Sequence, residues 1–199
     1  MKNAKALRAQ IATLSLAMTD FDPDSVLSVL RNFMVPDATV HMCYPFGDIV
    51  GPQALYDLAY APLLIAFPDL ERRDWIISTG TDADGADWIG CGGHYVGTFV
   101  SPFLDIPSTG HLAHMRFHEF YRVVDGKAVE MQAIWDLPEL MLQAGAWPMS
   151  PSLGREMFIP GPAAQDGLEP DGRNAKQSAH SLSVVMGMLT NLSRHPVEG

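Results

Sequence analysis

The strongest constraint on the fold is a pair of alternating stretches joined by an Asp-Gly dipeptide. Leu112–Val123 and Val129–Trp135 show the two-residue alternation of strands, and Asp125-Gly126 lies between them. Asp-Gly suits a tight hairpin turn, because both turn positions there need a positive φ. The sequence therefore predicts a long antiparallel hairpin whose second strand is closed by Asp136.

Further strand-like stretches precede this hairpin. Asp74–Thr79 and Trp88–Phe99 flank a polar turn, and Thr39–Tyr44 is rich in strand-forming residues. Pro45–Gly51 is expected to be a turn, and Ser101–Gly110 a loop with three turn formers. The second half of the main domain is therefore predicted to be mostly an antiparallel sheet.

The first third of the chain has helical periodicity instead. Apolar residues recur at helical spacing from Leu7 to Met18, and Asp22-Pro23 is a typical helix start. A third helix is expected from Pro52, with a kink or a break into two segments at Pro62. Helices followed by strands predict an α+β fold rather than a parallel doubly wound sheet.

The end of the chain differs in composition. Residues 146–171 are rich in Pro and Gly and are expected to form an extended arm, and Ala175–Leu192 is predicted to be a helix. The apolar stripe of this helix has to be buried against the main domain, a partner subunit or a missing second domain. We therefore expect a main domain over residues 1–145 and an arm with a helix over residues 146–199.

Charge and composition exclude some functions. The net charge is −10, from 13 basic and 23 acidic residues, which argues against binding to nucleic acid or to an anionic membrane surface. No stretch of about 20 apolar residues is present that could span a membrane. Two cysteines, Cys43 and Cys91, form no spacing pattern, which favours reduced thiols in a cytoplasmic protein. A disulfide between them remains the alternative.

The histidines raise the question of a metal site. His114 and His118 would be neighbours on a helix, but on the predicted strand four residues span about 13 Å. Zinc ligands bind at about 2 Å, so these two side chains cannot share one ion. The sequence therefore predicts no metal site.

Asp136 is the leading candidate for acid–base chemistry. It follows an apolar, aromatic strand and precedes an apolar helix, so its carboxylate is expected to be partly shielded from water and usable as an acid or base. The alternative is structural, because Asp before Leu137-Pro138 is an ordinary helix cap. On the partner strand, His114, Arg116 and His118 share one face, and Glu119 is a carboxylate on the apolar face.

Five stretches, in this order, carry a resemblance to a known family. They are APLLIAFPDLERRDWII (61–77), GGHYVGTF (92–99), LDIPSTG (104–110), EFYRVVDGKAVEMQAIWD (119–136) and LPELMLQAG (137–145). Together they resemble the SnoaL-like polyketide-cyclase family of the ketosteroid isomerase/NTF2-like superfamily. The resemblance covers roughly residues 22–145.

The resemblance implies a cone, in which a curved sheet wraps around the helices and leaves a deep apolar pocket. It also implies an enzyme without metal or cofactor, whose general acid–base is the aspartate at the end of the last strand, here Asp136. The chain departs from the family pattern at three places, one of which is a longer loop from Ser101 to Leu104. Tyr95 stands where the usual histidine is expected, with His94 shifted by one residue, and Gln132 replaces the usual tryptophan. A polyketide substrate therefore does not follow from the resemblance.

The sequence thus predicts a cofactor-free enzyme for aldol closure or enolisation of a small apolar carbonyl compound, active as a homodimer. Asp136 and His118 are the expected catalytic residues. The expected substrate-binding residues are His41, Tyr44, His94, Tyr95, His114, Glu119 and Trp135. Two alternatives stay open: a non-catalytic ligand-binding or dimerisation module, and a hydrolase or dehydratase with the same pocket.

Overall fold

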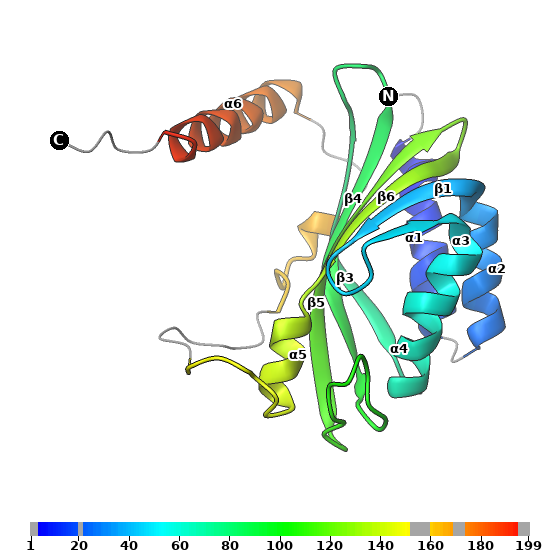
Figure 1. Ribbon diagram of the computed structural model, residues 1–199. Coiled ribbons are helices and arrows are strands. Elements are labelled where there is room, and N and C mark those ends of the chain that lie inside the picture. The colour runs from blue at the N-terminus through cyan, green and yellow to red at the C-terminus, as the bar shows by residue number, and fades with distance from the viewer. Residues whose placement is uncertain (1–3, 20–21, 152–159, 169–173, 195–199) are drawn as a thin grey trace. The chain divides into compact units, whose positions relative to one another are not determined.

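The computed structural model describes residues 4–19, 22–151, 160–168 and 174–194 (Figure 1). They belong to two units, Met1–Leu168 and Glu169–Gly199. The first unit contains, in chain order, α1 (Ala4–Thr19), α2 (Pro23–Phe33), β1 (Met34–Met42), β2 (Asp48–Val50), α3 (Gly51–Leu55), α4 (Ala61–Ala66), β3 (Glu71–Thr81), β4 (Asp87–Thr98), β5 (Leu112–Val124), β6 (Lys127–Trp135) and α5 (Leu137–Gln143). The second contains α6 (Ala175–Leu192).

The six strands form one curved sheet in the order β2-β1-β6-β5-β4-β3. All neighbouring pairs are antiparallel except β1 and β6, which are parallel. Helices α1 to α4 cover one face of the sheet, and α5 lies on the other side (Figure 1). The α+β architecture expected from the sequence is therefore confirmed.

Local signals in the sequence account for most element boundaries. Asp125 and Gly126 have φ of 49° and 78°, as the predicted hairpin requires. Asp22 caps α2 by accepting a hydrogen bond from the Asp24 N–H at 3.1 Å. The helix expected from Pro52 is divided by a π-helical turn, Tyr56–Tyr60, and Pro62 lies in the first turn of α4.

The turn predicted over residues 45–51 is wrong in part, because β2 lies within it. Three residues of β2 pair with β1 in the register Thr39↔Val50 to His41↔Asp48. β1 also begins earlier than expected, at Met34, and its pairing with β6 shifts register between Met34 and Thr39. This segment contains Pro36, which has no N–H to donate to a ladder.

The side chains that face the helices fill the inner side of the sheet. On β5 the odd-numbered residues from Ala113 to Val123 are buried, and the even-numbered ones lie on the outer face. Bulky aromatic side chains pack against one another on the inner side and are almost completely buried: Tyr60, Phe67, Tyr95, Phe99, Phe103, Phe117, Tyr121 and Trp135. The middle of the cone is therefore a packed core in which aromatic rings are prominent.

The described part of the arm packs on the sheet. A short 3₁₀ turn, Asp166–Leu168, lies against β3, and Gly161 is so close to Trp75 that a Cβ at this glycine would lie 2.2 Å from the Trp75 Cβ. In the second unit, α6 begins at the Asn174 cap and carries exposed apolar side chains. Among the described helices, none is long and apolar enough to cross a membrane.

Candidate functional site

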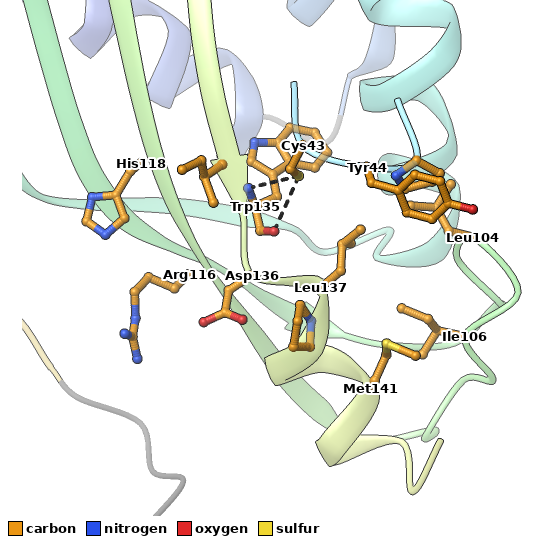
Figure 2. A pocket seen from close by; sticks show the side chains of 13 residues that line it. Cys43, Tyr44, Leu104, Ile106, Arg116, His118, Trp135, Asp136, Leu137 and Met141 are labelled. Atoms are coloured by element: carbon orange, nitrogen blue, oxygen red, sulfur yellow. Dashed lines mark hydrogen bonds between the residues drawn. The ribbon is translucent and has the colours of Figure 1, made fainter. Parts of the chain in front are cut away.

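A cleft of about 700 Å³ lies where the ends of β5 and β6 meet α5 (Figure 2). The turn after β1 and the loop before β5 form its other walls. It is lined by Cys43, Tyr44, Pro45, Leu104, Ile106, Arg116, His118, Ile134, Trp135, Asp136, Leu137, Pro138 and Met141. A volume of this size suits an organic ligand of drug-like dimensions.

The charged side chains of the cleft and its histidine gather at one end. Figure 2 shows Arg116, His118 and Asp136 together, while Leu104, Ile106 and Met141 lie opposite them. The site therefore combines a large apolar surface with one polar end, which would orient a ligand that carries a single polar group.

Asp136 is both a helix cap and a cleft residue. Its Oδ1 accepts a hydrogen bond from the Glu139 N–H at 3.1 Å at the start of α5. Its own N–H donates to the Arg116 carbonyl oxygen at 2.8 Å, and the Arg116 N–H donates to Glu139 Oε2 at 2.9 Å. The first turn of α5 thus continues the ladder of β5 beyond Trp135, and this fixes where the carboxylate lies.

Trp135 forms the wall between the cleft and the core. It lines the cleft, but only 2% of its surface is exposed, and its indole N–H donates to Glu119 Oε1 at 3.0 Å. Cys43 packs behind the same residue, since its sulfur accepts from the Trp135 N–H at 3.4 Å. Glu119 therefore fixes the indole of Trp135, and Cys43 contacts its backbone.

Glu119 lies on the core side of that wall, in a fully buried polar network. Its carboxylate forms an ion pair with Arg72 Nη1 at 2.6 Å and accepts hydrogen bonds from the hydroxyls of Tyr121 at 2.7 Å and Tyr95 at 2.8 Å. Burial by itself raises the pKa of Glu119, but the charge of Arg72 and these hydrogen bonds outweigh it and hold the pKa below its usual value. The strand has no bulge at Glu119, because its register with β4 is continuous.

The structure brings four of the nine predicted site residues to the cleft: Tyr44, His118, Trp135 and Asp136. The other five lie elsewhere. Tyr95 and Glu119 belong to the buried network. His41 has an exposed side chain on β1, with its Nδ1 2.7 Å from Asp48 Oδ1. Their predicted role in substrate binding stays a prediction that this geometry does not favour.

His94 and His114 lie together on the outer face of the sheet. With Glu139 they form a group whose candidate ligand atoms all lie within 4.8 Å of one another, a cluster that the sequence did not reveal. However, the Trp75 indole N–H donates to His94 Nδ1 at 3.1 Å, so neutral His94 carries its proton on Nε2. A metal ion needs a lone pair at the remaining ring nitrogen, so His94 in this tautomer does not suit a metal ligand.

Burial and basic neighbours determine the electrostatics at His94. Burial is the main reason that the pKa of His94 falls to about 4, and the nearby His114, Arg116 and His118 lower it further. Asp136 acts in the opposite direction. His94 is therefore neutral at neutral pH.

The sequence missed most of the apolar wall and Arg116. The alternation of β5 had placed Arg116 on the face of His118, and this was the available signal. Leu104, Ile106 and Met141 come from the loop and α5, whose positions against the sheet are not encoded by a local pattern.

Comparisons with solved structures find proteins of the same fold. IdmH from Streptomyces antibioticus, described as a "putative polyketide cyclase", is 25% identical, with a TM-score of 0.57, over 70% of this chain and 98% of that chain. The "putative hydroxylase" AclR from Streptomyces galilaeus is 20% identical, with a TM-score of 0.57, over 74% of this chain and 89% of that chain. A "putative SnoaL-like polyketide cyclase" from Jannaschia sp. CCS1 is 21% identical, with a TM-score of 0.52, over 70% and 93%.

No curated protein matches the chain. The family model of the SnoaL-like polyketide cyclases matches residues 12–144, which include every element from α2 to α5 and both walls of the cleft. The resemblance stated from the sequence is therefore confirmed, and the chain belongs to the SnoaL-like polyketide cyclase family.

Proposed function

We propose that this protein is a cofactor-free acid–base enzyme that enolises a small apolar carbonyl compound in the Asp136 cleft, as a polyketide cyclase does before aldol closure. The observation that carries the proposal is the position of Asp136, whose carboxylate lies at the same end of a largely apolar cleft as Arg116 and His118. A base and a hydrogen-bond donor on one side of an apolar site are the two groups that enolisation needs.

The reaction would begin with Asp136 taking a proton from the carbon next to a carbonyl group. The electron pair of the broken C–H bond forms a C=C bond, and the π electrons of the carbonyl group move to its oxygen. His118 stabilises the resulting enolate oxygen by donating a hydrogen bond. The enolate carbon then either attacks a second carbonyl group of the same molecule, which closes a ring, or regains a proton at another position. In ring closure Asp136 passes its proton to the new alkoxide oxygen. In the other case Asp136 exchanges its proton with solvent and then returns a proton to carbon, so that in deuterium oxide the carbon gains deuterium.

Proton exchange tests this without knowledge of the natural substrate. We would incubate the protein with 2-tetralone, an apolar ring ketone, in deuterium oxide and follow loss of the C1 proton signal by NMR. The wild type is expected to accelerate exchange over the buffer rate, and Asp136→Asn to lower the protein-catalysed rate by at least about 100-fold. A rate unchanged in Asp136→Asn would remove Asp136 from the mechanism.

The same variant separates chemistry from capping. Asn is as good a helix cap as Asp, so Asp136→Asn should unfold at nearly the wild-type denaturant concentration. Asp136→Ala should lose the bond to the Glu139 N–H and about 1 kcal/mol of stability. Loss of exchange in Asp136→Asn with stability retained would therefore be a chemical effect.

A second candidate is a ligand-binding module without catalysis. It is favoured by the cap itself, because the hydrogen bond to Oδ1 gives Asp136 a structural reason to be present. Binding of 2-tetralone without accelerated exchange in the wild type would favour this candidate.

We also propose, from the sequence, a cytoplasmic homodimer that does not bind nucleic acid. The acidic net charge of −10 supports the last point, and exposed apolar residues on the outer face of the sheet, such as Phe120 and Ile134, support pairing. Light scattering coupled to size exclusion that finds a monomer at all concentrations would refute the dimer.

A further inference from the structure

The polar end of the cleft contains a permanent cation that the acid–base scheme does not use. Of the described residues that line the cleft, Arg116 alone has a side chain that is charged positively at every physiological pH. Its side chain is 30% exposed and lies beside Asp136 (Figure 2). A cation at the polar end of an apolar cleft is a feature of sites that bind organic anions.

The position of Arg116 is fixed by its backbone rather than by its charge. Both its N–H and its carbonyl oxygen are bonded to the first turn of α5, through Glu139 and Asp136. The guanidinium Nη2 is 3.7 Å from Glu139 Oε1, which is too long for a hydrogen bond. The carboxylate of Glu139 is occupied elsewhere, by the Arg116 N–H and by His114 Nδ1 at 3.3 Å. The side chain thus keeps donors for a ligand.

The side chains on the same face as Arg116 include hydrogen-bonding groups, those of His94, His114 and His118. Two carboxylates oppose the charge of Arg116: Asp136 in the cleft and Glu139, whose Oε1 is 3.7 Å from the guanidinium. An anionic group bound to the guanidinium on the side away from Asp136 would gain two parallel hydrogen bonds, the arrangement in which Arg binds carboxylates most strongly.

We propose that the ligand of this cleft is an apolar, ring-sized molecule that carries one anionic oxygen group, a carboxylate or an acidic enol, which is held by Arg116. The inference rests on the proposed function only in taking this cleft as the ligand site. It narrows the substrate class, because a neutral ketone would offer the guanidinium no charged group, and Glu139 at 3.7 Å is too far away to accept a hydrogen bond from it.

Two matched pairs of probes test the proposal by calorimetry at pH 7. The carboxylate pair is 2-naphthoate against neutral 2-naphthamide, and the enol pair is 2-hydroxy-1,4-naphthoquinone against its neutral 2-methoxy analogue. In at least one pair the wild type should prefer the anion, and Arg116→Gln should weaken binding of that anion about tenfold or more while changing its neutral partner less than about threefold. The pair that shows this effect identifies the anionic group.

Arg122→Gln is the matched control, because Arg122 lies on the same face of β5 but is paired with Glu130 at 2.8 Å and lies outside the cleft. If Arg122→Gln weakens binding of the anionic probe as much as Arg116→Gln does, the overall charge of the protein is responsible for the effect, and the proposal is overturned. The absence of an Arg116-dependent preference in both pairs would also overturn it. If Arg116→Gln no longer binds any of the four probes, binding to Arg116→Lys is measured instead. A retained preference of Arg116→Lys for the anion supports the proposal, and equal binding of anion and neutral partner overturns it.

The result of this binding test is independent of the result of the proton-exchange test of Asp136. Failure of anion preference with Asp136-dependent exchange intact would overturn only the role of Arg116. An Arg116-dependent preference without any Asp136-dependent exchange would leave an anion-binding cleft and overturn only the proposed chemistry.

Discussion

Replacing Glu119 by Gln would test whether the buried network stabilises the core. Each oxygen of the carboxylate receives two close donors: Arg72 and Tyr121 at Oε2, and Tyr95 and Trp135 at Oε1. Whichever way a glutamine amide is oriented, its NH₂ group therefore faces two donors. The change also leaves the fully buried guanidinium of Arg72 with Asp74 as its remaining ion-pair partner.

The expected loss is large. Removing one partner of a buried ion pair costs about 3–5 kcal/mol, a substantial part of the 5–15 kcal/mol that stabilises a typical domain. Tyr121→Phe, which removes a single donor at 2.7 Å, should cost about 1–2 kcal/mol. Guanidinium chloride unfolding at pH 7, followed by circular dichroism, measures both losses.

The control is Glu71→Gln, in which an exposed carboxylate loses its surface pairing with Arg73 at 2.7 Å. This pair should contribute less than about 1 kcal/mol. Since the pKa of Glu119 is held below its usual value, its contribution is complete above about pH 4.5 and decreases as the pH falls through the lowered pKa. The reasoning is refuted if Glu119→Gln unfolds within about 1 kcal/mol of the wild type at pH 7.

Two more variants test the sheet. A Cβ at Gly93 would lie 2.3 Å from the Arg73 carbonyl oxygen and 2.6 Å from Phe117 Cζ, so Gly93→Ala should lower the free energy of unfolding in urea by at least about 2 kcal/mol. Gly80→Ala is the control: a Cβ there would meet open space, and the free energy of unfolding should change by less than about 1 kcal/mol. Equal losses in the two variants would contradict the packing around Gly93. For His94, the pKa of about 4 lies below the usual 6.5, so the unfolded chain binds a proton more readily and stability falls as the pH decreases from 6.5 to 4. This decrease in stability, at most about 3 kcal/mol, should be smaller in His94→Gln and unchanged in His111→Gln, the control at an exposed residue. If stability depends on pH in the same way in the wild type and both variants, His94 is not the source of the decrease.

The sequence predicts the sheet well because its alternation is local. Side chains alternate between the two faces along β5, which predicts Glu119 and His118 on opposite faces, and the structure places them so. The partners of Glu119 could not be predicted in the same way. Arg72 is 47 positions away and Tyr60 is 59 positions away, and only the packing of β3 and the helices against β5 brings them together.

The position of the cleft could not be predicted for a related reason. The family resemblance implies a pocket deep inside the cone, where this chain has a packed core that includes Tyr60, Phe99 and Trp135. The cleft described here depends instead on where α5 and the loop over residues 101–110 lie against the sheet. Asp136 lines it because it ends β6 and begins α5, a position that the sequence does predict.

Capping and catalysis are therefore not alternatives for Asp136. A carboxylate has about four lone-pair sites, and the bond from the Glu139 N–H uses one of them. The capping hydrogen bond restrains the side chain and leaves the other lone pairs of the carboxylate able to accept a proton, which is what a positioned base requires. A carboxylate is a mild base, so it removes protons efficiently only from acidic carbon, such as a CH₂ group between two carbonyls. A compound of that kind also ionises readily to an enolate, the kind of group that we propose Arg116 to hold. The base and the cation at this end of the cleft thus favour the same class of substrate.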